Sequence, residues 1–334
     1  MSPRTTILIP CWNAGDHLEP LLRSLLAQRR APAALVLVDD GSDDGSPARA
    51  RAVAGDRVRV VEGGERRGLS GNWNRALALA DTELLALAHQ DDVYDEDWLG
   101  VMEDALDAAP EAGFAHCRAR AIDDDGRAVD SPVEGYKRRF FADIDHADLG
   151  ALYRRLYAGN FVCCPSIVYR TALFGRVGPF DDGLRFTADW DLAFRTLLAG
   201  VPFVAVDRVL LGYRRHRTSA TAAQRHSLNR YEEERATLAE ARRRGIEQGF
   251  LGPDTGPSPA LRNNLLFDAY LDVQEGRRPE ARRKLAWGRA ELEGFARDPL
   301  ARGVALALGL GPLGPPLLRL GLWARLRLGP RRVG

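Results

Sequence analysis

The stretch Thr6-Ile7-Leu8-Ile9-Pro10-Cys11-Trp12-Asn13 opens the chain with a short apolar run that gives way at once to a polar loop. Such a run predicts a buried strand that ends at the loop. Further short apolar runs, at residues 35–38, 58–61 and 84–88, alternate with helical patterns at residues 17–28, 71–80 and 96–109. This alternation is typical of a parallel sheet covered by helices. The N-terminal part therefore predicts an α/β fold.

The later part of the chain changes character. Residues 123–145 are charged and weakly periodic, which predicts a surface excursion. Apolar residues return at 161–169, and a helix at 191–199 and strands at 202–206 and 209–213 are expected after them. Beyond residue 221 the pattern is helical, with one helix at 222–244 and a hairpin of helices 261–275 and 280–293. We expect an α/β part of residues 1–221 and a helical part of residues 222–334.

Composition excludes several classes of function. The 334 residues include 47 Lys and Arg against 46 Asp and Glu, a net charge of +1, so no bulk attraction to nucleic acid is expected. The cysteines Cys11, Cys117, Cys163 and Cys164 form no C-x-x-C pair and are too few for a disulfide framework. The N-terminus lacks the pattern of a signal peptide. We therefore expect a cytoplasmic protein in a reducing compartment.

The C-terminal tail is basic and rich in leucine. Residues 300–334 hold six arginines and no acidic residue, and glycines and prolines interrupt the apolar run. A membrane span needs about 20 nearly uninterrupted apolar residues, so spanning is not expected. Two interpretations stay open: peripheral contact with the inner face of the cell membrane, or a terminal helix docked on its own domain.

Two acidic groups follow predicted strands, where open α/β sheets bind their ligands. Asp39 and Asp40 follow the strand at 35–38, and adjacent carboxylates repel each other unless a cation, a base edge or a sugar hydroxyl compensates. Asp91 and Asp92 follow the strand at 84–88 in the sequence His89-Gln90-Asp91-Asp92. Carboxylate oxygens are the ligands that Mg²⁺ and Mn²⁺ prefer. A simple turn and a helix cap remain the alternatives for these two pairs.

Two further groups lie later in the chain. Asp189 precedes a predicted helix beside Trp190, an aromatic ring of the kind that stacks on sugars, although a helix cap is again the alternative. Arg214 and His216 belong to the cationic sequence Tyr213-Arg214-Arg215-His216-Arg217, which follows a predicted strand. These cations could neutralise a diphosphate or pair with the acidic loops.

The order of these motifs resembles the family 2 glycosyltransferases, which are nucleotide-sugar-dependent, inverting enzymes of the GT-A fold. The resemblance spans residues 5–221 and implies a mostly parallel central sheet flanked by helices, with an α-helical C-terminal extension. The sequence Gln90-Asp91-Asp92 before an aromatic residue resembles rhamnosyltransferase-like members that build bacterial polysaccharides. The motifs that carry the resemblance are Ile9-Pro10-Cys11-Trp12-Asn13, Val38-Asp39-Asp40-Gly41-Ser42, Gly68-Leu69-Ser70-Gly71-Asn72-Trp73-Asn74, Gln90-Asp91-Asp92, Gly178-Pro179-Phe180-Asp181, Ala188-Asp189-Trp190-Asp191 and Tyr213-Arg214-x-His216.

The resemblance implies a role for each matching residue. Asp189 matches the catalytic base, Trp190 is assigned to the acceptor, and Asp91 and Asp92 match the motif that holds Mg²⁺ or Mn²⁺. The residues assigned to the nucleotide sugar are Pro10, Cys11, Asn13, Asp39, Asp40, Gly68, Asn74, Asp91, Arg214 and His216. The chain departs from the pattern at His89, where most members have Asp, and at Ala188, where many have Glu.

We therefore expect transfer of a hexosyl or deoxyhexosyl group from a nucleoside diphosphate sugar to a hydroxyl of a saccharide or lipid-linked saccharide. The process would serve cell-surface polysaccharide or glycolipid synthesis. The alternative is a non-catalytic nucleotide-sugar-binding module whose helical region recruits a partner. A dinucleotide-dependent oxidoreductase is disfavoured, because the loop after the first strand lacks the Gly-x-Gly-x-x-Gly pattern.

Overall fold

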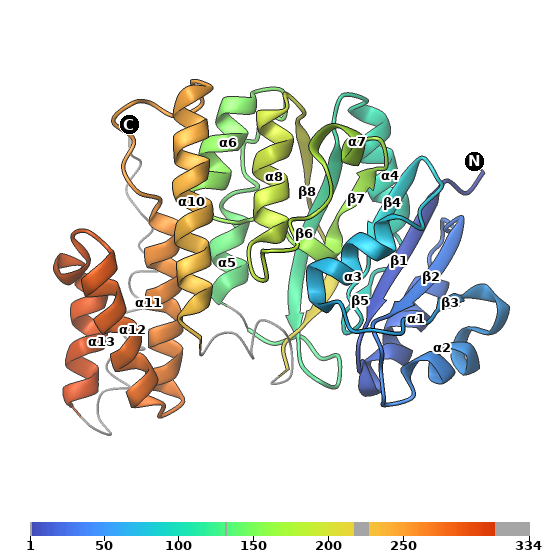
Figure 1. The fold of residues 1–334 in the computed structure, drawn as a ribbon, viewed down its shortest axis with the longest axis horizontal. Helices are drawn as coiled ribbons and strands as arrows, with labels where there is room; N and C mark the ends of the chain where they lie inside the picture. The colour runs from blue at the N-terminus through green and yellow to red at the C-terminus, as the bar shows by residue number, and fades with distance from the viewer. Residues whose placement is uncertain (1, 131, 217–226, 311–334) are drawn as a thin grey trace. The chain divides into compact units, whose positions relative to one another are not determined.

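The computed structural model describes residues 2–130, 132–216 and 227–310 (Figure 1). Among them, residues 2–216 and 239–256 form one compact unit, here called the sheet unit. Residues 227–238 and 257–310 form a second one, the helical unit, and α10 (Asn229–Glu247) contributes to both. The expected boundary at residue 221 lies outside the described residues, as do residues 311–334 of the basic tail.

The sheet unit contains an eight-stranded sheet in the order β3-β2-β1-β4-β7-β6-β8-β5. Its strands are β1 (Thr5–Cys11), β2 (Ala34–Asp39), β3 (Arg59–Val61), β4 (Leu84–Leu87), β5 (Val93–Tyr94), β6 (Phe114–Ile122), β7 (Val168–Arg170) and β8 (Phe203–Arg214). The strands β3, β2, β1 and β4 are parallel, and so is the pair β6 and β8. Strand β7 is antiparallel to both of its neighbours, and β5 is antiparallel to β8. The expected α/β fold is confirmed as a mixed sheet.

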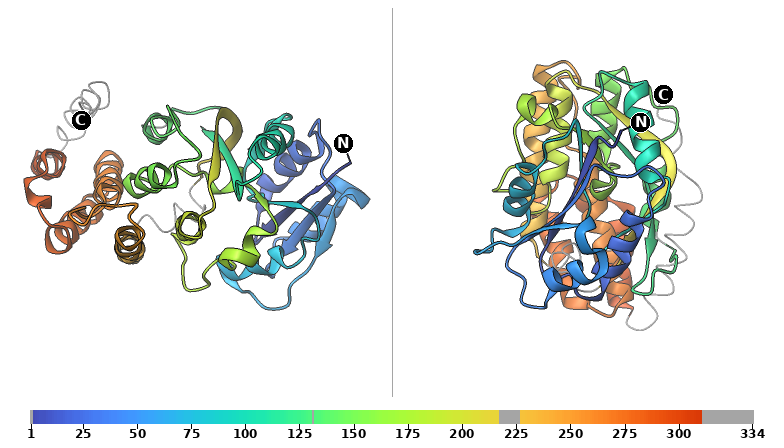
Figure 2. Two further views of the ribbon diagram at one scale, coloured as in Figure 1. Left: turned by 90° about the horizontal axis from the view of Figure 1, so that it is seen from above. Right: turned by 90° about the vertical axis from the view of Figure 1, so that its right-hand side faces the viewer.

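Helices cover both faces of this sheet (Figures 1 and 2). Alternate residues of β1 explain the two faces, because Ile7 and Ile9 join a core with α1, α2 and α4, whereas Leu8, also buried, does not. Helix α3 contacts β1 and β2 outside that core. The helices of the sheet unit before α10 are α1 (Leu18–Leu26), α2 (Ser46–Ala54), α3 (Gly68–Leu77), α4 (Trp98–Ala108), α5 (Pro132–Arg138), α6 (Leu149–Ala158), α7 (Leu173–Val177) and α8 (Ala188–Leu198).

Two features of the sheet differ from the sequence expectation. The strands expected at 202–206 and 209–213 are one continuous strand, β8. Its register against β6 shifts where Val206 pairs with Cys117 and Val209 pairs with Arg118, so the polar residues between them form a bulge. Strand β6 was not expected at all, because Arg118 and Arg120 interrupt its apolar pattern.

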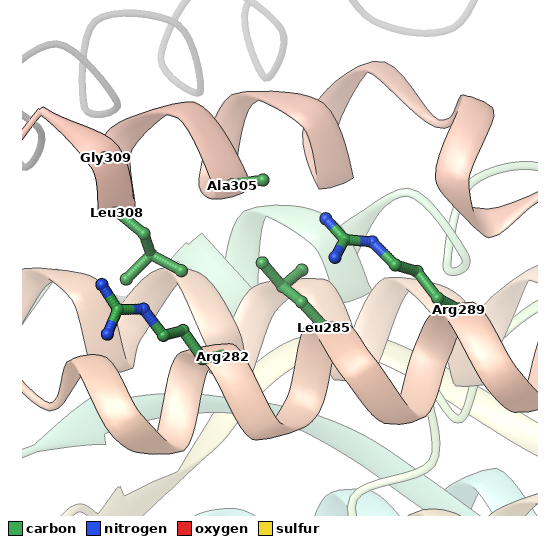
Figure 3. Close-up of a pocket in the computed structure, with 6 residues that line it drawn as sticks. All are labelled: Arg282, Leu285, Arg289, Ala305, Leu308 and Gly309. Atoms are coloured by element: carbon green, nitrogen blue, oxygen red, sulfur yellow. The ribbon is translucent and has the colours of Figure 1, made fainter.

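The helical unit contains the expected hairpin, formed by α11 (Pro259–Gln274) and α12 (Arg278–Glu291). Gly276 has a φ of +76° at the turn, a conformation that favours glycine. Helix α13 (Pro299–Gly309) follows, and a hollow between α12 and α13 has Leu285 and Leu308 at its floor, with Arg282 and Arg289 beside them (Figure 3). No helix in the described part of the chain is long and apolar enough to cross a membrane.

Candidate active site

Three loops meet at one edge of the sheet, because β2, β1 and β4 are parallel neighbours whose carboxyl ends lie together. The backbone N–H of Trp12 donates to Gln90 Oε1 at 2.7 Å, and Gln90 Nε2 donates to the Trp12 carbonyl at 3.0 Å. The N–H of Asn13 donates to Ser42 Oγ at 2.9 Å. The loop after β1 is therefore hydrogen-bonded to the loops after β4 and β2.

The acidic pair after β2 is used to build its own loop. Asp39 is 4% exposed and accepts hydrogen bonds from the N–H groups of Gly41, at 3.1 Å, and Ser42, at 3.0 Å. Asp40 is 2% exposed; its two oxygens accept from the N–H groups of Arg67, at 2.8 Å, and Gly68, at 2.9 Å. Backbone donors thus compensate the repulsion between these carboxylates. The structure places both acids at the expected edge, but with their oxygens committed to the chain.

The acidic pair after β4 is held differently. Asp92 is 1% exposed and its Oδ1 accepts from the N–H of Arg214 at 2.9 Å, whereas its Oδ2 is buried and has no hydrogen-bond partner among the described residues. Asp91 Oδ2 lies 2.8 Å from His216 Nε2. The side chain of His89 completes a group whose ligand atoms all lie within 4.8 Å of one another.

The electrostatics of this group separate its two acids. Burial raises the pKa of Asp92 well above its usual value, and the charge of Asp91 adds to the effect. Burial would also raise the pKa of Asp91, but the hydrogen bond from His216 and the charge of His89 bring that pKa below its usual value. Burial lowers the pKa of His89. A divalent cation would stabilise the ionised forms of Asp91 and Asp92, because its positive charge compensates the negative charges of two adjacent buried carboxylates.

The cations after β8 play two different roles. The Arg214 guanidinium donates to the carbonyl of Asp91 at 2.7 Å and to those of Asp123 and Asp124, and its side chain is buried. These donors join the end of β8 to the segments at Asp91 and at Asp123 and Asp124, and the assignment of Arg214 to a diphosphate stays a prediction. His216 does lie at the acidic pair, and its ring centroid is 4.7 Å from that of His17.

Asp189 lies at the start of α8. Its Oδ1 accepts from the N–H of Trp190 at 2.9 Å, and Asn160 Nδ2 donates to its Oδ2 at 3.4 Å. Burial raises the pKa of Asp189 above its usual value, although the charge of Lys137 acts in the opposite direction. A carboxylate with a raised pKa is a stronger base than an exposed one.

Asp189 and Asp92 both affect the ionisation of Cys163 and Cys164. Burial, with the charges of Asp92 and Asp189 acting in the same direction, raises the pKa of the Cys163 thiol to about 11, although the charges of Lys137 and Arg215 lower it. Burial and the same two carboxylates raise the pKa of Cys164 well above its usual value. Acids from two distant segments of the chain therefore influence the same pair of thiols.

Three other expected site residues have structural contacts. Trp190 is 2% exposed, donates to the Leu156 carbonyl at 3.2 Å and stacks on the ring of Phe194, and its assignment to the acceptor stays a prediction. The Asn74 amide bonds both the N–H and the carbonyl of Phe180, at 3.0 and 2.8 Å, and so fixes the segment before α8. Cys11 is buried in the core, and burial raises its pKa to about 12.

Sequence reasoning missed some residues that the structure places at the site. The Trp12 ring is 39% exposed and carries the Arg66 guanidinium 3.4 Å from its centroid, so an aromatic face stands at the sheet edge beside Pro10 and Asn13. Asn160 and Lys137 act on Asp189 from segments without a readable pattern. The sequence could have indicated Trp12, because a large aromatic residue stands there in an otherwise polar loop.

The sequence is similar to those of known glycosyltransferases. The model of glycosyl transferase family 2 matches residues 6–170. The chain is 28% identical over 209 residues to the succinoglycan biosynthesis protein ExoO of Rhizobium meliloti (strain 1021), which covers 59% of this chain and 57% of that relative. It is 28% identical over 198 residues to a PGL/p-HBAD biosynthesis glycosyltransferase of Mycobacterium bovis (strain BCG / Pasteur 1173P2), covering 58% of this chain and 70% of the relative.

Solved structures show the same fold. The mannosyltransferase PcManGT from Pyrobaculum calidifontis, in complex with GDP-Man and Mn²⁺, matches with a TM-score of 0.59 and 21% identity over 96% of this chain and 86% of that one. S. aureus TarS 1-349, in complex with UDP-GlcNAc, matches with a TM-score of 0.56 and 18% identity over 92% of each chain. The fold is therefore GT-A, a fold of nucleotide-sugar glycosyltransferases. Residues 6–170 of the chain belong to glycosyltransferase family 2.

Proposed function

We propose that this chain transfers a sugar from a nucleoside diphosphate sugar to an acceptor hydroxyl, with inversion at the anomeric carbon. The observation that carries the proposal is the group of His89, Asp91 and Asp92 that follows β4, in which Asp92 Oδ2 is buried and has no hydrogen-bond partner among the described residues. The raised pKa of Asp189 supports its assignment as a base. Residues 1–221 are proposed as the catalytic part.

Asp189 is the proposed base. It would take the proton of the acceptor hydroxyl as that oxygen attacks the anomeric carbon, and the bond to the diphosphate breaks on the opposite face. Asn160 and the N–H of Trp190 hold the carboxylate in place for this step. General-base help of this kind is worth about 10²- to 10⁴-fold in rate.

Asp91 and Asp92 would hold a Mg²⁺ or Mn²⁺ ion. The buried Oδ2 of Asp92, for which the described residues supply no hydrogen-bond donor, fits this ion, because such an oxygen needs a positive partner. When bound, the ion supplies positive charge for the departing diphosphate. His216 fixes Asp91 from the end of β8.

The nucleotide is assigned to the edge formed by the loops after β1, β2 and β4. Asp39, Asp40 and Gly68 build this edge, and the exposed face of Trp12 offers a surface for a base or a sugar. TarS 1-349 and PcManGT are in complex with UDP-GlcNAc and with GDP-Man, respectively. We propose a hexosyl or deoxyhexosyl donor and a saccharide or lipid-linked saccharide acceptor, in polysaccharide or glycolipid synthesis.

The Asp189→Asn variant tests the proposal. We expect it to bind the nucleoside diphosphate normally, since no donor contact is lost, and to transfer sugar about 10²- to 10⁴-fold more slowly. A panel of nucleotide sugars, screened by thermal shift with Mn²⁺, first identifies the donor. Transfer is then followed by chromatography, and the anomeric configuration of the product is determined by NMR.

Asp191→Asn is the matched control. Asp191 lies two residues further along α8 and pairs with Arg195 at 2.7 Å, so it carries a similar charge without the contact to Asn160. The control should keep its transfer rate. Near-normal transfer by Asp189→Asn would remove Asp189 from the mechanism, and nucleotide affinity without turnover in the unmodified protein would support a binding module instead.

Peripheral contact with the inner face of the cell membrane is a second, separate proposal. Helix α13 leaves Leu306 66% exposed and Leu310 39% exposed, and Arg302 is exposed on the same helix. Exposed apolar side chains next to a cation suit an anionic membrane interface. Co-sedimentation with vesicles containing phosphatidylserine should fall in Leu306→Glu, and unchanged binding of that variant would contradict the proposal.

A further inference from the structure

His89 contributes a buried ring nitrogen to the acidic pair after β4. Its Nε2 has no hydrogen-bond partner in the described part of the chain, and neither has Asp92 Oδ2. The residues that carry these two atoms, His89 and Asp92, form a group with Asp91 in which one ligand atom of each residue lies within 4.8 Å of those of the others. Two buried groups left without a donor or acceptor in one place need a common partner.

Two oxygens of the group are already committed to hydrogen bonds, and this decides where an ion fits. Asp92 Oδ1 accepts from the N–H of Arg214 at 2.9 Å, and Asp91 Oδ2 pairs with His216 at 2.8 Å. Each carboxylate is thus tied by one oxygen to the end of β8 and keeps a second oxygen. Ligand atoms stand about 2.0 to 2.2 Å from a bound transition metal, so two of them lie at most about 4.4 Å apart. The limit of 4.8 Å between the ligand atoms of this group is close to that distance.

The ring of His89 is held in position by its packing. Its centroid lies 5.4 Å from that of Trp73, with 30° between the two planes. Trp73 is 5% exposed and belongs to α3, so the imidazole of His89 packs against a buried ring of a helix. A ligand that is already oriented loses little freedom when it binds an ion.

A second buried imidazole shows that an unpartnered nitrogen alone does not make a metal site. Both ring nitrogens of His116 lack partners among the residues described, but its ring neighbours are Phe114, Phe141, Phe161 and Phe203. Of the groups of metal-ligating side chains that the described residues form, none contains His116, whereas His89 stands beside two carboxylates.

We propose that His89 is a direct nitrogen ligand of the divalent ion at Asp91 and Asp92, so that the centre has a mixed nitrogen and oxygen donor set. This inference rests on the proposed function only in using the same ion site. Imidazole suits zinc, iron and nickel, whereas Mg²⁺ prefers oxygen ligands. The centre therefore favours transition metals over Mg²⁺ more strongly than a site of carboxylates alone.

The test measures the ion without turnover. The full chain is loaded with Mn²⁺ in the absence of donor, and electron spin echo envelope modulation records nitrogen bound to the ion. We expect a nitrogen coupling in the unmodified protein and in His216→Gln, and its loss in His89→Gln. No nitrogen coupling in the unmodified protein, or a coupling that survives in His89→Gln and disappears in His216→Gln, would overturn the proposal.

A second measurement does not depend on the fold of His89→Gln. Isothermal titration gives the affinities of the unmodified chain and of His89→Asp for Zn²⁺ and Mg²⁺. We expect the ratio of Zn²⁺ to Mg²⁺ affinity to fall about tenfold or more in His89→Asp, since the loss of even an outer contact costs 10- to 100-fold in metal affinity. An unchanged ratio overturns the proposal. Because both measurements omit the donor, their failure leaves the Asp189→Asn test of transfer unaffected.

Discussion

The two Asp-Asp pairs of the sheet unit follow β2 and β4, the two strands that flank β1, yet they are opposite in chemistry. The oxygens of Asp40 accept from backbone N–H groups, and those of Asp39 accept from backbone N–H groups and from the Ser42 hydroxyl. Asp92 keeps a buried oxygen without a partner among the described residues, and Asp91 is paired through one oxygen with a histidine. The first pair is part of the loop structure, and the second is left with capacity for a ligand.

This contrast shows that the repulsion within an acidic pair can be compensated in two ways, and only one of them leaves the pair able to bind a ligand. Adjacent carboxylates always repel each other, and the protein can compensate with its own donors or with an outside cation. Since the two pairs stand at equivalent places, substitutions at matched positions should affect stability in one case and ligand binding in the other.

The largest expected effect on stability is that of Asp40→Asn. The amide keeps one acceptor, so one of the two N–H groups that Asp40 now satisfies is left buried and unpaired. We expect the free energy of unfolding to fall by about 3 kcal/mol, measured by urea denaturation. Asp92→Asn should change that free energy by no more than about 1 kcal/mol at neutral pH, since burial already disfavours the charge it removes. Equal losses in the two variants would break the comparison.

A smaller effect on stability is expected for His116, the buried imidazole whose ring neighbours are phenylalanines, and it depends on pH. Burial lowers its pKa to about 3, and the charges of Lys137 and His146 act in the same direction. In the unfolded chain this pKa is about 6.5, so the unfolded state binds a proton that the folded state does not. The contribution of His116 to stability is therefore fully present above about pH 6.5 and is lost as the pH falls towards 3.

The variant His116→Leu isolates this contribution. Between pH 7 and pH 5 the unmodified protein should lose about 2 kcal/mol more of its unfolding free energy than the variant, at about 1.4 kcal/mol per pH unit below the unfolded pKa. The measurement is the urea midpoint of both proteins at the two pH values. Parallel losses would show that His116 is hydrated or paired in the folded protein.

The smallest effect is that of Ser42→Ala. Its hydroxyl donates to Asp39 and accepts from the N–H of Asn13 at 2.9 Å, so it links the loops after β2 and β1. We expect a loss of about 1 kcal/mol in unfolding free energy, because such bonds contribute about 0.5 to 1.5 kcal/mol each and water replaces part of them. Metal affinity should stay unchanged, and a clear change in it would show that this loop also contributes to the ion site.

Much of the fold could be predicted because the local spacing of apolar and polar residues determines many of its strands and helices. Strands β1, β2 and β4 are short apolar runs that end in polar loops, and α11 and α12 have helical spacing on both sides of a glycine. Strand β6 could not be predicted, since its arginines are accommodated only by pairing with the distant strand β8.

The sequence predicted that the acids lie at the ends of the strands, but it did not predict their hydrogen-bond partners. The acids were expected at the strand ends because sheet topology fixes that edge. Which donors reach each carboxylate depends on the distant residues Arg67 and Arg214, whose positions follow from the tertiary fold. Trp190 shows the same limit, because a helix position beside Asp189 does not reveal whether the ring faces the core.

The measurement that tests the central claim most directly is the Mn²⁺ affinity of Asp92→Asn and Asp40→Asn, followed by the loss of the free-ion signal in electron paramagnetic resonance. We expect Asp92→Asn to weaken Mn²⁺ binding about tenfold or more, and folded Asp40→Asn to bind within about twofold of the unmodified protein. Unchanged binding in Asp92→Asn, or a larger loss in Asp40→Asn, would contradict the assignment of the ion to the acidic pair after β4.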